Sequence, residues 1–138
     1  MVVIGTKGVI LMSENITILV ADDEDRIRRL LKMYLEREGY EVDEAENGAE
    51  ALEKAVEKDY HAIILDVMMP EKDGFEFLKM LREQNNKIPF IVFTVTEDKE
   101  TALKAFTLGA NGFVGKYGDP ETVFATLRRC IEKSVNTR

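Results

Sequence analysis

Four short apolar runs, each followed by a residue with a chemically useful side chain, constrain most strongly what this chain can fold into. The runs cover residues 18–21, 62–65, 90–93 and 112–115. The residues that follow them are Asp22 with Asp23, then Asp66, Thr94 and Lys116. Runs of this kind, separated by helical patterns, indicate buried parallel strands. We therefore expect an α/β fold built on a parallel sheet.

The ends of these strands predict a binding site. In an open parallel sheet, the carboxyl ends of the strands meet at one crevice. Three carboxylates that meet there repel one another, and Mg²⁺, which prefers oxygen ligands, relieves that repulsion. We expect Asp23 and Asp66 to bind the ion directly and Asp22 to bind it through water, with Mn²⁺ as an alternative ion. Together with the hydroxyl and the ammonium group, such a site suits a phosphoryl group.

The segments between the apolar runs carry helix signals. The first helix ends at Gly39, and a short strand follows over residues 41–45. Asn47 and Glu50 have the spacing of a capping box at the start of the next helix. Further helices are expected over residues 75–81, over residues 102–106 and from the pair Asp119–Pro120, the last with a buried face of Val123, Phe124, Leu127, Cys130 and Ile131.

Composition excludes several classes of protein. The chain has 138 residues, enough for one domain with a substantial core. Its formal net charge of -7 argues against nucleic-acid binding, whose affinity comes mostly from neutralised phosphates. Apolar stretches are too short to span a bilayer. Cys130 is the only cysteine, so an internal disulfide cannot form, and we expect a cytoplasmic protein without membrane insertion.

The first residues of the chain differ from the rest, because they contain no pattern that carries chemistry. We expect residues 1–14 to be a mobile extension and residues 15–138 to form the domain. An upstream start, with Met12 as the true initiator, would explain the same segment. Because its apolar part is short, an additional strand over residues 9–12 is the less favoured alternative.

One loop and its surroundings resemble a known family. Residues 66–74, Asp-Val-Met-Met-Pro-Glu-Lys-Asp-Gly, are similar to the phosphoacceptor loop of response-regulator receiver domains of two-component systems, in particular the single-domain chemotaxis-regulator type. The resemblance extends from residue 16 to about residue 135. It includes, in the family's order, Asp22 with Asp23, Thr94, residues 109–113 and Lys116. It implies a flavodoxin-like (βα)5 fold, a doubly wound parallel sheet with strand order 2-1-3-4-5.

The resemblance also implies roles for single residues. Asp66 would accept a phosphoryl group as a carboxylate nucleophile, so that the chain assists its own phosphorylation and dephosphorylation without turning over a separate substrate. Thr94 and Lys116 would stabilise the transferring oxygens together with the metal. Phe113 has the place of an aromatic that swings inward on phosphorylation, so it forms the switch with Thr94. The implied metal ligands are Asp22, Asp23, Asp66 and the main-chain carbonyl of Met68.

The phosphoryl donor is expected to be another protein, because His61 is the only histidine and precedes a strand. A histidine kinase or a phosphotransfer protein fits this role. Contacts made only after phosphorylation would bias a surface of the fourth helix, fifth strand and fifth helix. Since the last helix uses nearly all the remaining chain, we expect contact with a downstream protein or the next phosphorelay carrier. Residues on or near that surface are Lys99, Lys104, Phe113, Tyr117 and Arg128.

Three other functions share parts of this pattern. A degenerate receiver would act only as a protein-interaction module, but the acids are intact. A Mg²⁺-dependent phosphatase of the aspartyl-phosphate type carries a second Asp two residues after its nucleophile, where this chain has Met68. A flavin- or dinucleotide-binding protein can share the topology, but no G-x-G-x-x-G follows the first strand.

Two positions depart from the family's pattern. Tyr117 replaces the proline that usually follows the lysine, and we expect a trans bond there because a cis bond before another residue costs about 2.5–4 kcal/mol. Val95 replaces a small residue after Thr94. Met68 can only weakly orient a hydrolytic water, and Val95 narrows its path. We therefore expect a long-lived phosphorylated form.

Overall fold

The computed structural model describes the chain except for residues 1, 6–7, 12–14, 70–73 and 137–138. The strands are β1 (Val2–Gly5), β2 (Gly8–Leu11), β3 (Thr17–Ala21), β4 (Glu41–Ala45), β5 (Ala62–Leu65), β6 (Phe90–Thr94) and β7 (Gly112–Gly115). The helices are α1 (Asp25–Arg37), α2 (Gly48–Glu57), α3 (Gly74–Glu83), α4 (Lys99–Thr107) and α5 (Pro120–Asn136). Strand and helix alternate from β3 to α5, as the apolar runs predicted.

Five of the strands form one parallel sheet in the order β4-β3-β5-β6-β7. Counted from the first strand of this sheet, the order is 2-1-3-4-5, which confirms the predicted flavodoxin-like topology. A helix lies between consecutive strands of the sheet in the chain, because parallel strands need a long crossover connection. Every residue of β3, β5 and β6 is buried, as expected for strands that are covered on both faces.

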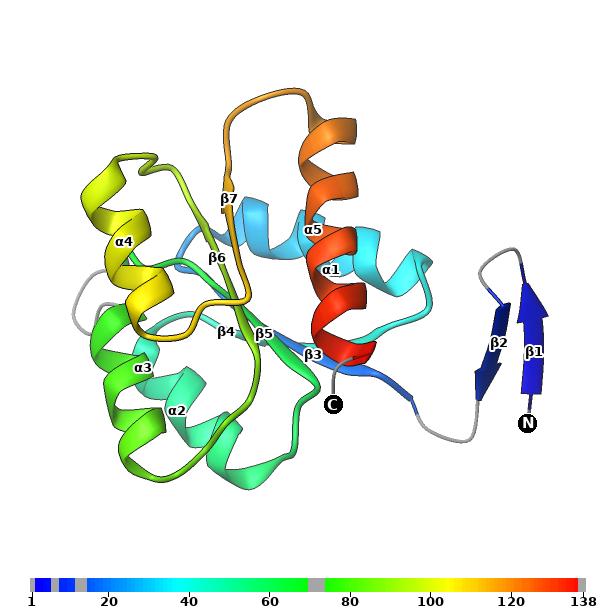
Figure 1. Ribbon diagram of the computed structural model, residues 1–138, viewed down its shortest axis with the longest axis horizontal. Coiled ribbons are helices and arrows are strands. Elements are labelled where there is room, and N and C mark those ends of the chain that lie inside the picture. Colours follow the sequence, from blue (N-terminus) through cyan, green and yellow to red (C-terminus); the bar gives the residue numbers. More distant parts are fainter. Residues whose placement is uncertain (1, 6–7, 12–14, 70–73, 137–138) are drawn as a thin grey trace.

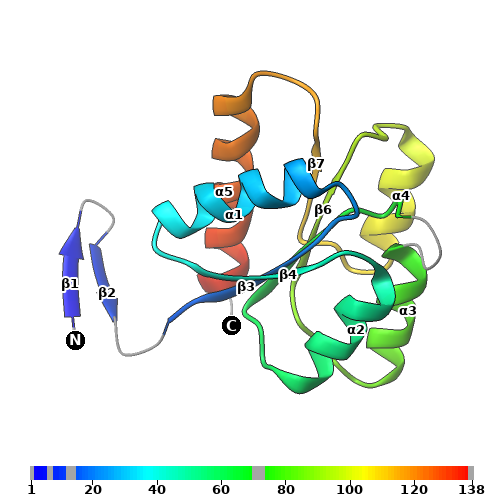
Figure 2. The same ribbon diagram turned by 180° about the vertical axis from the view of Figure 1, so that it is seen from behind.

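Helices cover the two faces of the sheet in unequal sets (Figures 1 and 2). α1 and α5 pack on one face, and α2, α3 and α4 pack on the other. β3 contributes to both sides, because Ile18 and Val20 join the α1–α5 cluster and Leu19 joins the opposite one. Each face of the sheet therefore has its own hydrophobic core, and the domain has three layers.

Local capping signals agree with the helix ends. The Asn47 side chain accepts a hydrogen bond from the Glu50 main-chain N–H at 2.8 Å, as predicted. The Glu50 carboxylate reaches back to the Glu46 N–H at 3.3 Å, so this half of the capping box is shifted by one residue. Gly39 and Gly109 have φ values of 97° and 96°, the left-handed conformation that commonly follows a helix.

The apolar residues of the last two helices differ in burial. In α5, Leu127 and Ile131 are buried and the other predicted members of the apolar face pack against them, which confirms that face. In α4, Leu103 and Phe106 are 69% and 53% exposed. Within the described part of the chain, no helix is both long and apolar enough to cross a membrane.

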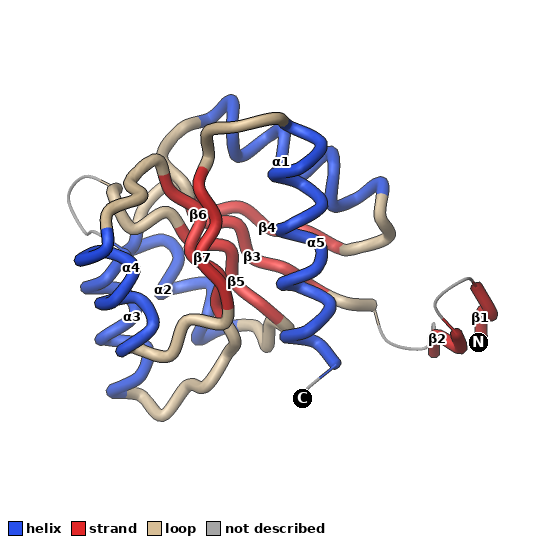
Figure 3. The backbone as a smooth tube through the Cα atoms, turned by 45° about the horizontal axis from the view of Figure 1, so that its top comes forward, coloured by secondary structure: helices blue, strands red, loops and turns tan. Residues whose placement is uncertain are grey.

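The N-terminal segment contains two strands. β1 and β2 pair antiparallel, with Val2 opposite Leu11, and they lie outside the five-stranded sheet (Figure 3). β2 nearly coincides with the strand over residues 9–12 that was the less favoured alternative, and its β-branched residues favour such a structure. Met12 lies outside the described residues. The division into a mobile extension and a domain stays a prediction.

Candidate functional site

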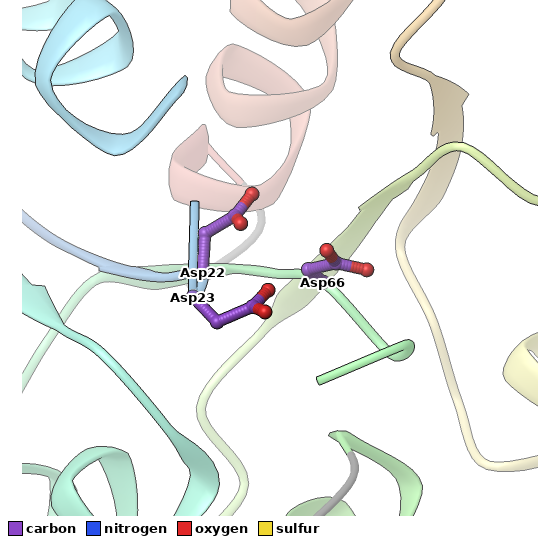
Figure 4. Close-up of side chains that lie close together, drawn as sticks. All are labelled: Asp22, Asp23 and Asp66. Atoms are coloured by element: carbon purple, nitrogen blue, oxygen red, sulfur yellow. The ribbon is translucent and has the colours of Figure 1, made fainter. Parts of the chain in front are cut away.

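The carboxylates of Asp22, Asp23 and Asp66 lie together at the carboxyl end of the sheet (Figure 4). β3 and β5 pair with Ala21 opposite Leu65, so the residues that follow these strands are neighbours. The Asp66 main-chain N–H donates to the Ala21 carbonyl oxygen at 3.0 Å. One oxygen from each carboxylate lies within 4.8 Å of the others. The predicted acidic cluster is therefore present in the structure.

The three acids differ in burial. Asp22 and Asp66 are 1% and 4% exposed, whereas Asp23 is exposed. Burial raises the pKa of Asp22, although contacts with Lys116 and the Glu24 main-chain N–H partly oppose this shift. A raised carboxyl pKa means that the ionised form is destabilised at this position, so additional positive charge would be favourable there.

Lys116 supplies positive charge from the end of β7. Its Nζ donates to Asp66 Oδ2 at 2.8 Å, and its side chain is 3% exposed. Nζ also lies 2.7 Å from Asp22 Oδ2, an ion pair without hydrogen-bond alignment. Burial alone would lower the pKa of Lys116, but the two carboxylates outweigh it and raise the pKa. The lysine is therefore charged and joins the two buried acids.

Thr94 ends β6 beside the lysine, because its carbonyl oxygen accepts the Lys116 main-chain N–H at 2.9 Å. The residue is fully buried. Its Oγ1 has no hydrogen-bond partner among the described residues. A buried hydroxyl without a partner costs about 1–3 kcal/mol and is uncommon in native structures. This hydroxyl is therefore available for a group that binds at the site.

Two residues near the site were not anticipated from the sequence. Glu24 Oε1 lies 3.4 Å from Lys116 Nζ at the exposed rim. Arg28 is 4% exposed, and its Nη1 donates to the Asp22 carbonyl oxygen at 2.7 Å. A signal for Arg28 was present, because it shares the buried stripe of α1 with Leu31.

The residues expected to flank the path of water are both accessible. Met68 and Val95 are 55% and 38% exposed. The Met68 main-chain N–H donates to Asp66 Oδ1 at 3.0 Å, so each oxygen of the Asp66 carboxylate accepts a hydrogen bond from a described residue. The Met68 carbonyl as a metal ligand, and the long-lived phosphorylated form, stay predictions. Residues 70–73 of the predicted phosphoacceptor loop lie outside the described residues.

The predicted switch aromatic lies on the α4 side of β7. Phe113 is half-buried, packs against the core beneath α2, α3 and α4, and contacts Phe106 with ring centroids 6.5 Å apart. Tyr117 is 73% exposed. The Lys116–Tyr117 peptide bond is trans, as predicted. The inward swing of Phe113 on phosphorylation stays a prediction.

His61 lies at the opposite end of β5 from the acids. It precedes that strand, whereas Asp66 follows it. Its Nδ1 accepts a hydrogen bond from the Thr17 main-chain N–H at 3.1 Å. This histidine therefore has a structural contact far from the acidic cluster, and its exclusion as a phosphodonor stays a prediction.

The donor set fits a hard divalent cation. Three carboxylates converge, and among the described residues Lys116 is the one cation that pairs with any of them, contacting Asp22 and Asp66. The cluster therefore keeps excess negative charge, and oxygen is the ligand atom that Mg²⁺ prefers. Asp22, Asp23 and Asp66 are the side chains that would hold such an ion.

Comparisons of the sequence identify related proteins. The family model of the response regulator receiver domain matches residues 18–128. The transcriptional regulatory protein SrrA of Staphylococcus aureus (strain NCTC 8325 / PS 47) is 42% identical over 120 residues, which cover 87% of this chain and 49% of SrrA. The chain thus spans about half the length of the curated relatives that it matches.

Solved structures show the same fold. The chemotaxis response regulator CheY4 of Vibrio cholerae is 36% identical with a TM-score of 0.76, covering 85% of this chain and 99% of that one. The response regulator TrrA of Thermotoga maritima, in complex with Mg²⁺-BeF, is 35% identical with a TM-score of 0.71, covering 83% and 98%. From the extent of the family match and these identities, this chain belongs to the response regulator receiver domain family.

Proposed function

We propose that this domain is a phosphorylation-dependent signalling switch that accepts a phosphoryl group on Asp66. The observation that carries the proposal is the placement of Asp66 in a cluster with Asp22 and Asp23, where it also accepts a hydrogen bond from the Lys116 ammonium group. The buried Thr94 hydroxyl, which has no partner among the described residues, supplies a further donor at the same edge. Such donors suit the oxygens of an aspartyl phosphate.

The proposed reaction is transfer from a phosphohistidine of a histidine kinase or phosphotransfer protein. An Asp66 carboxylate oxygen forms the new O–P bond while the P–N bond of the phosphohistidine breaks. The imidazole leaves with the electron pair of that bond and takes up a proton. Lys116, whose Nζ donates to Asp66 Oδ2 at 2.8 Å, and Thr94 donate to the phosphoryl oxygens.

A divalent cation completes the proposed site. Asp22, Asp23, Asp66 and the main-chain carbonyl of Met68 are the groups that would hold it. When bound, the ion would neutralise negative charge on the phosphoryl oxygens. The Mg²⁺-BeF complex of the relative TrrA supports Mg²⁺ as this ion. A kinase partner of this kind also favours the cytoplasm as the location of the domain.

The switch acts, we propose, on a surface formed by α4, β7 and the start of α5. Phosphoryl contacts with Thr94 and Lys116 exist only in the modified state, so they bias the conformation of this region. Leu103 and Phe106 of α4 are exposed there, and Phe106 contacts Phe113 of β7. An exposed apolar surface that is linked to the site suits a downstream protein partner.

The proposed target surface keeps the residues expected from the sequence except one, Arg128. Lys99, Lys104 and Tyr117 are exposed and remain candidates. Arg128 instead lies 3.6 Å from Glu38, beyond the end of α1. The helical period of α5 turns this arginine toward α1, so we leave it out of the proposed target surface.

The test is phosphoryl uptake by Asp66→Asn. With Mg²⁺ and a small phosphodonor such as acetyl phosphate, we expect the wild type to gain one phosphoryl group by mass spectrometry and Asp66→Asn to gain none. Asp98→Asn is the matched control, because Asp98 caps α4 by accepting from the Thr101 N–H, has no hydrogen bond or ion pair with the three acids, and asparagine is an equally good cap. Radioactive phosphate from a labelled kinase tests the physiological donor.

Three outcomes would contradict the proposal. Equal uptake by Asp66→Asn would exclude Asp66 as the acceptor. A wild-type domain that takes up no phosphoryl group from either donor would favour the interaction-only alternative. Continuous release of phosphate from a monoester by the wild type would favour the phosphatase alternative.

A further inference from the structure

Arg28 is a buried cation that joins three segments next to the acidic cluster. Its Nη1 donates to the Asp22 carbonyl oxygen at 2.7 Å. Its Nε donates to Glu44 Oε1 at 3.1 Å, and its Nη2 donates to the Asp25 carboxylate. One side chain thereby connects the first turn of α1, the end of β3 and the strand β4. Nothing in the reaction proposed above uses it.

The contact with Asp22 holds one particular peptide unit. The Asp22 carbonyl and the Asp23 N–H belong to the same planar group, so fixing one fixes the other. The Asp22 N–H donates to the Ala45 carbonyl oxygen at 3.0 Å, which holds the preceding peptide unit. The Asp23 carboxylate itself has no hydrogen bond or ion pair with any described residue. Its position therefore depends on the backbone that carries it and on its own side-chain rotamer.

We propose that Arg28 is a positioning residue for the cation site, which by holding the Asp22–Asp23 peptide unit aims the Asp23 carboxylate at the space it shares with Asp66 (Figure 4). The inference rests on the proposed function in that it takes the acidic cluster as a cation site. Mg²⁺ demands near-ideal octahedral geometry, so a small rotation of one ligand matters. Loss of a partner behind a metal ligand typically weakens affinity by about 10–100-fold.

Charge and geometry predict opposite results for the loss of Arg28. Removing a cation near three carboxylates strengthens their attraction for Mg²⁺. Losing a positioning contact weakens Mg²⁺ binding. Arg29 is the matched control, because it is the next residue of α1, is exposed, and its side chain makes no hydrogen bond or ion pair with the described residues. Arg29→Met therefore removes the same charge without the buried contacts.

The experiment measures Mg²⁺ and Ca²⁺ dissociation constants by calorimetry, with unfolding in urea followed in parallel. We expect Arg28→Met to bind Mg²⁺ about 10–100-fold more weakly than the wild type. The loss for Ca²⁺ should be smaller, because Ca²⁺ tolerates irregular ligand geometry. Arg29→Met should bind Mg²⁺ as the wild type does, or slightly more tightly. Arg28→Lys keeps the charge with fewer contacts and should lie between the wild type and Arg28→Met.

Several results would overturn the inference. One is an unchanged or stronger Mg²⁺ affinity in Arg28→Met, which would leave only the charge effect. Another is an equal loss for Mg²⁺ and Ca²⁺, which would indicate general disruption rather than misplaced geometry. If Arg28→Met does not fold, Arg28→Lys decides on the same criteria. A wild type that binds no Mg²⁺ would instead refute the cation site itself, so the two failures are distinct.

Discussion

Buried polar groups at the two ends of the central sheet differ in whether they have hydrogen-bond partners. At the amino end, the Thr17 N–H donates to His61 Nδ1 and the His61 N–H donates back to the Thr17 carbonyl oxygen. The Tyr60 hydroxyl there donates to Asp43 Oδ2 at 2.7 Å. At the carboxyl end, the Thr94 hydroxyl has no partner among the described residues, and of the three clustered carboxylates only those of Asp22 and Asp66 pair with Lys116. The buried polar groups at the amino end therefore have hydrogen-bond partners, whereas some of those at the carboxyl end do not.

This difference separates residues that stabilise the fold from residues that serve a function. Paired buried polar groups stabilise the native state, whereas incompletely satisfied ones lower its stability and are retained where function needs them. The same strands, β3 and β5, supply both ends, so the difference comes from the residues at the strand termini. Substitutions at the carboxyl end should therefore remove function at little cost in stability, and substitutions at the amino end should do the reverse.

The largest effect is expected for Asp23→Ala at the carboxyl end. This change should abolish Mg²⁺ binding and phosphoryl uptake. The free energy of unfolding should stay the same or increase, because repulsion among the three carboxylates falls. Calorimetry with Mg²⁺, uptake from a small phosphodonor and urea unfolding measure the three quantities. Phosphoryl uptake at the wild-type rate would show that the metal assignment is wrong. It would also contradict the claim that the acids at the carboxyl end serve function.

A smaller loss of function, together with a gain in stability, is expected for Thr94→Val. Valine has nearly the same shape as threonine and removes the unpartnered hydroxyl, so the free energy of unfolding should rise by about 1 kcal/mol. The conformational response of α4 to phosphorylation should weaken at the same time. Urea unfolding and amide hydrogen exchange in α4 measure these changes. A less stable Thr94→Val protein would show that this end of the sheet is satisfied after all.

The smallest effect is expected for Tyr60→Phe at the amino end. The change removes a hydrogen bond to a carboxylate that is 35% exposed, so the free energy of unfolding should fall by only about 1 kcal/mol. Mg²⁺ affinity should not change, because Tyr60 lies at the other end of the sheet. A Tyr60→Phe protein with normal stability and weakened Mg²⁺ binding would show that this amino-end residue serves function rather than stability.

The pH dependence of the Tyr60→Phe effect provides a control. Burial alone would raise the pKa of Asp43, but hydrogen bonds from Tyr60 and Lys58 outweigh it and hold the pKa below its ordinary 3.8. The stabilisation from this carboxylate is therefore complete above pH about 4 and is lost as the pH falls through the folded-state pKa. The stability difference between wild type and Tyr60→Phe should narrow in acid. A constant difference from neutral pH to about pH 3 would contradict this assignment.

The site residues that follow from the sequence are those whose position is fixed by strand ends. Asp22, Asp66, Thr94 and Lys116 each follow an apolar run, and parallel pairing brings such ends together whatever the loops do. The predicted strand over residues 41–45 coincides with β4, in which Val42 and Ala45 are buried. Local pattern was therefore sufficient for the alternation of strands and helices and for the cluster of acids, whereas the strand order 2-1-3-4-5 came from the resemblance to receiver domains.

Features that depend on contacts between distant segments did not follow from the sequence. The burial of Arg28 requires Glu44 of β4 as a partner, and a helical stripe does not indicate what a cation will meet. Leu103 and Phe106 fit a helical apolar pattern, yet both are exposed, because surface apolar residues are common in folded proteins. The ion pair between Arg128 and Glu38, at the end of α1, likewise joins segments that are distant in the sequence.

Because of the contacts of Lys116, the site can accept a phosphoryl group only when folding is nearly complete. This lysine meets Asp66 across 50 residues of sequence and Glu24 across 92. Contacts of such long range form slowly, because much of the chain must be ordered before they are made. A chain folded only through β6 would hold the three carboxylates without their ammonium group, and their repulsion would oppose closure of that intermediate. A nascent or partly unfolded molecule therefore presents no competent acceptor, and formation of the aspartyl phosphate reports that the last strand is in place.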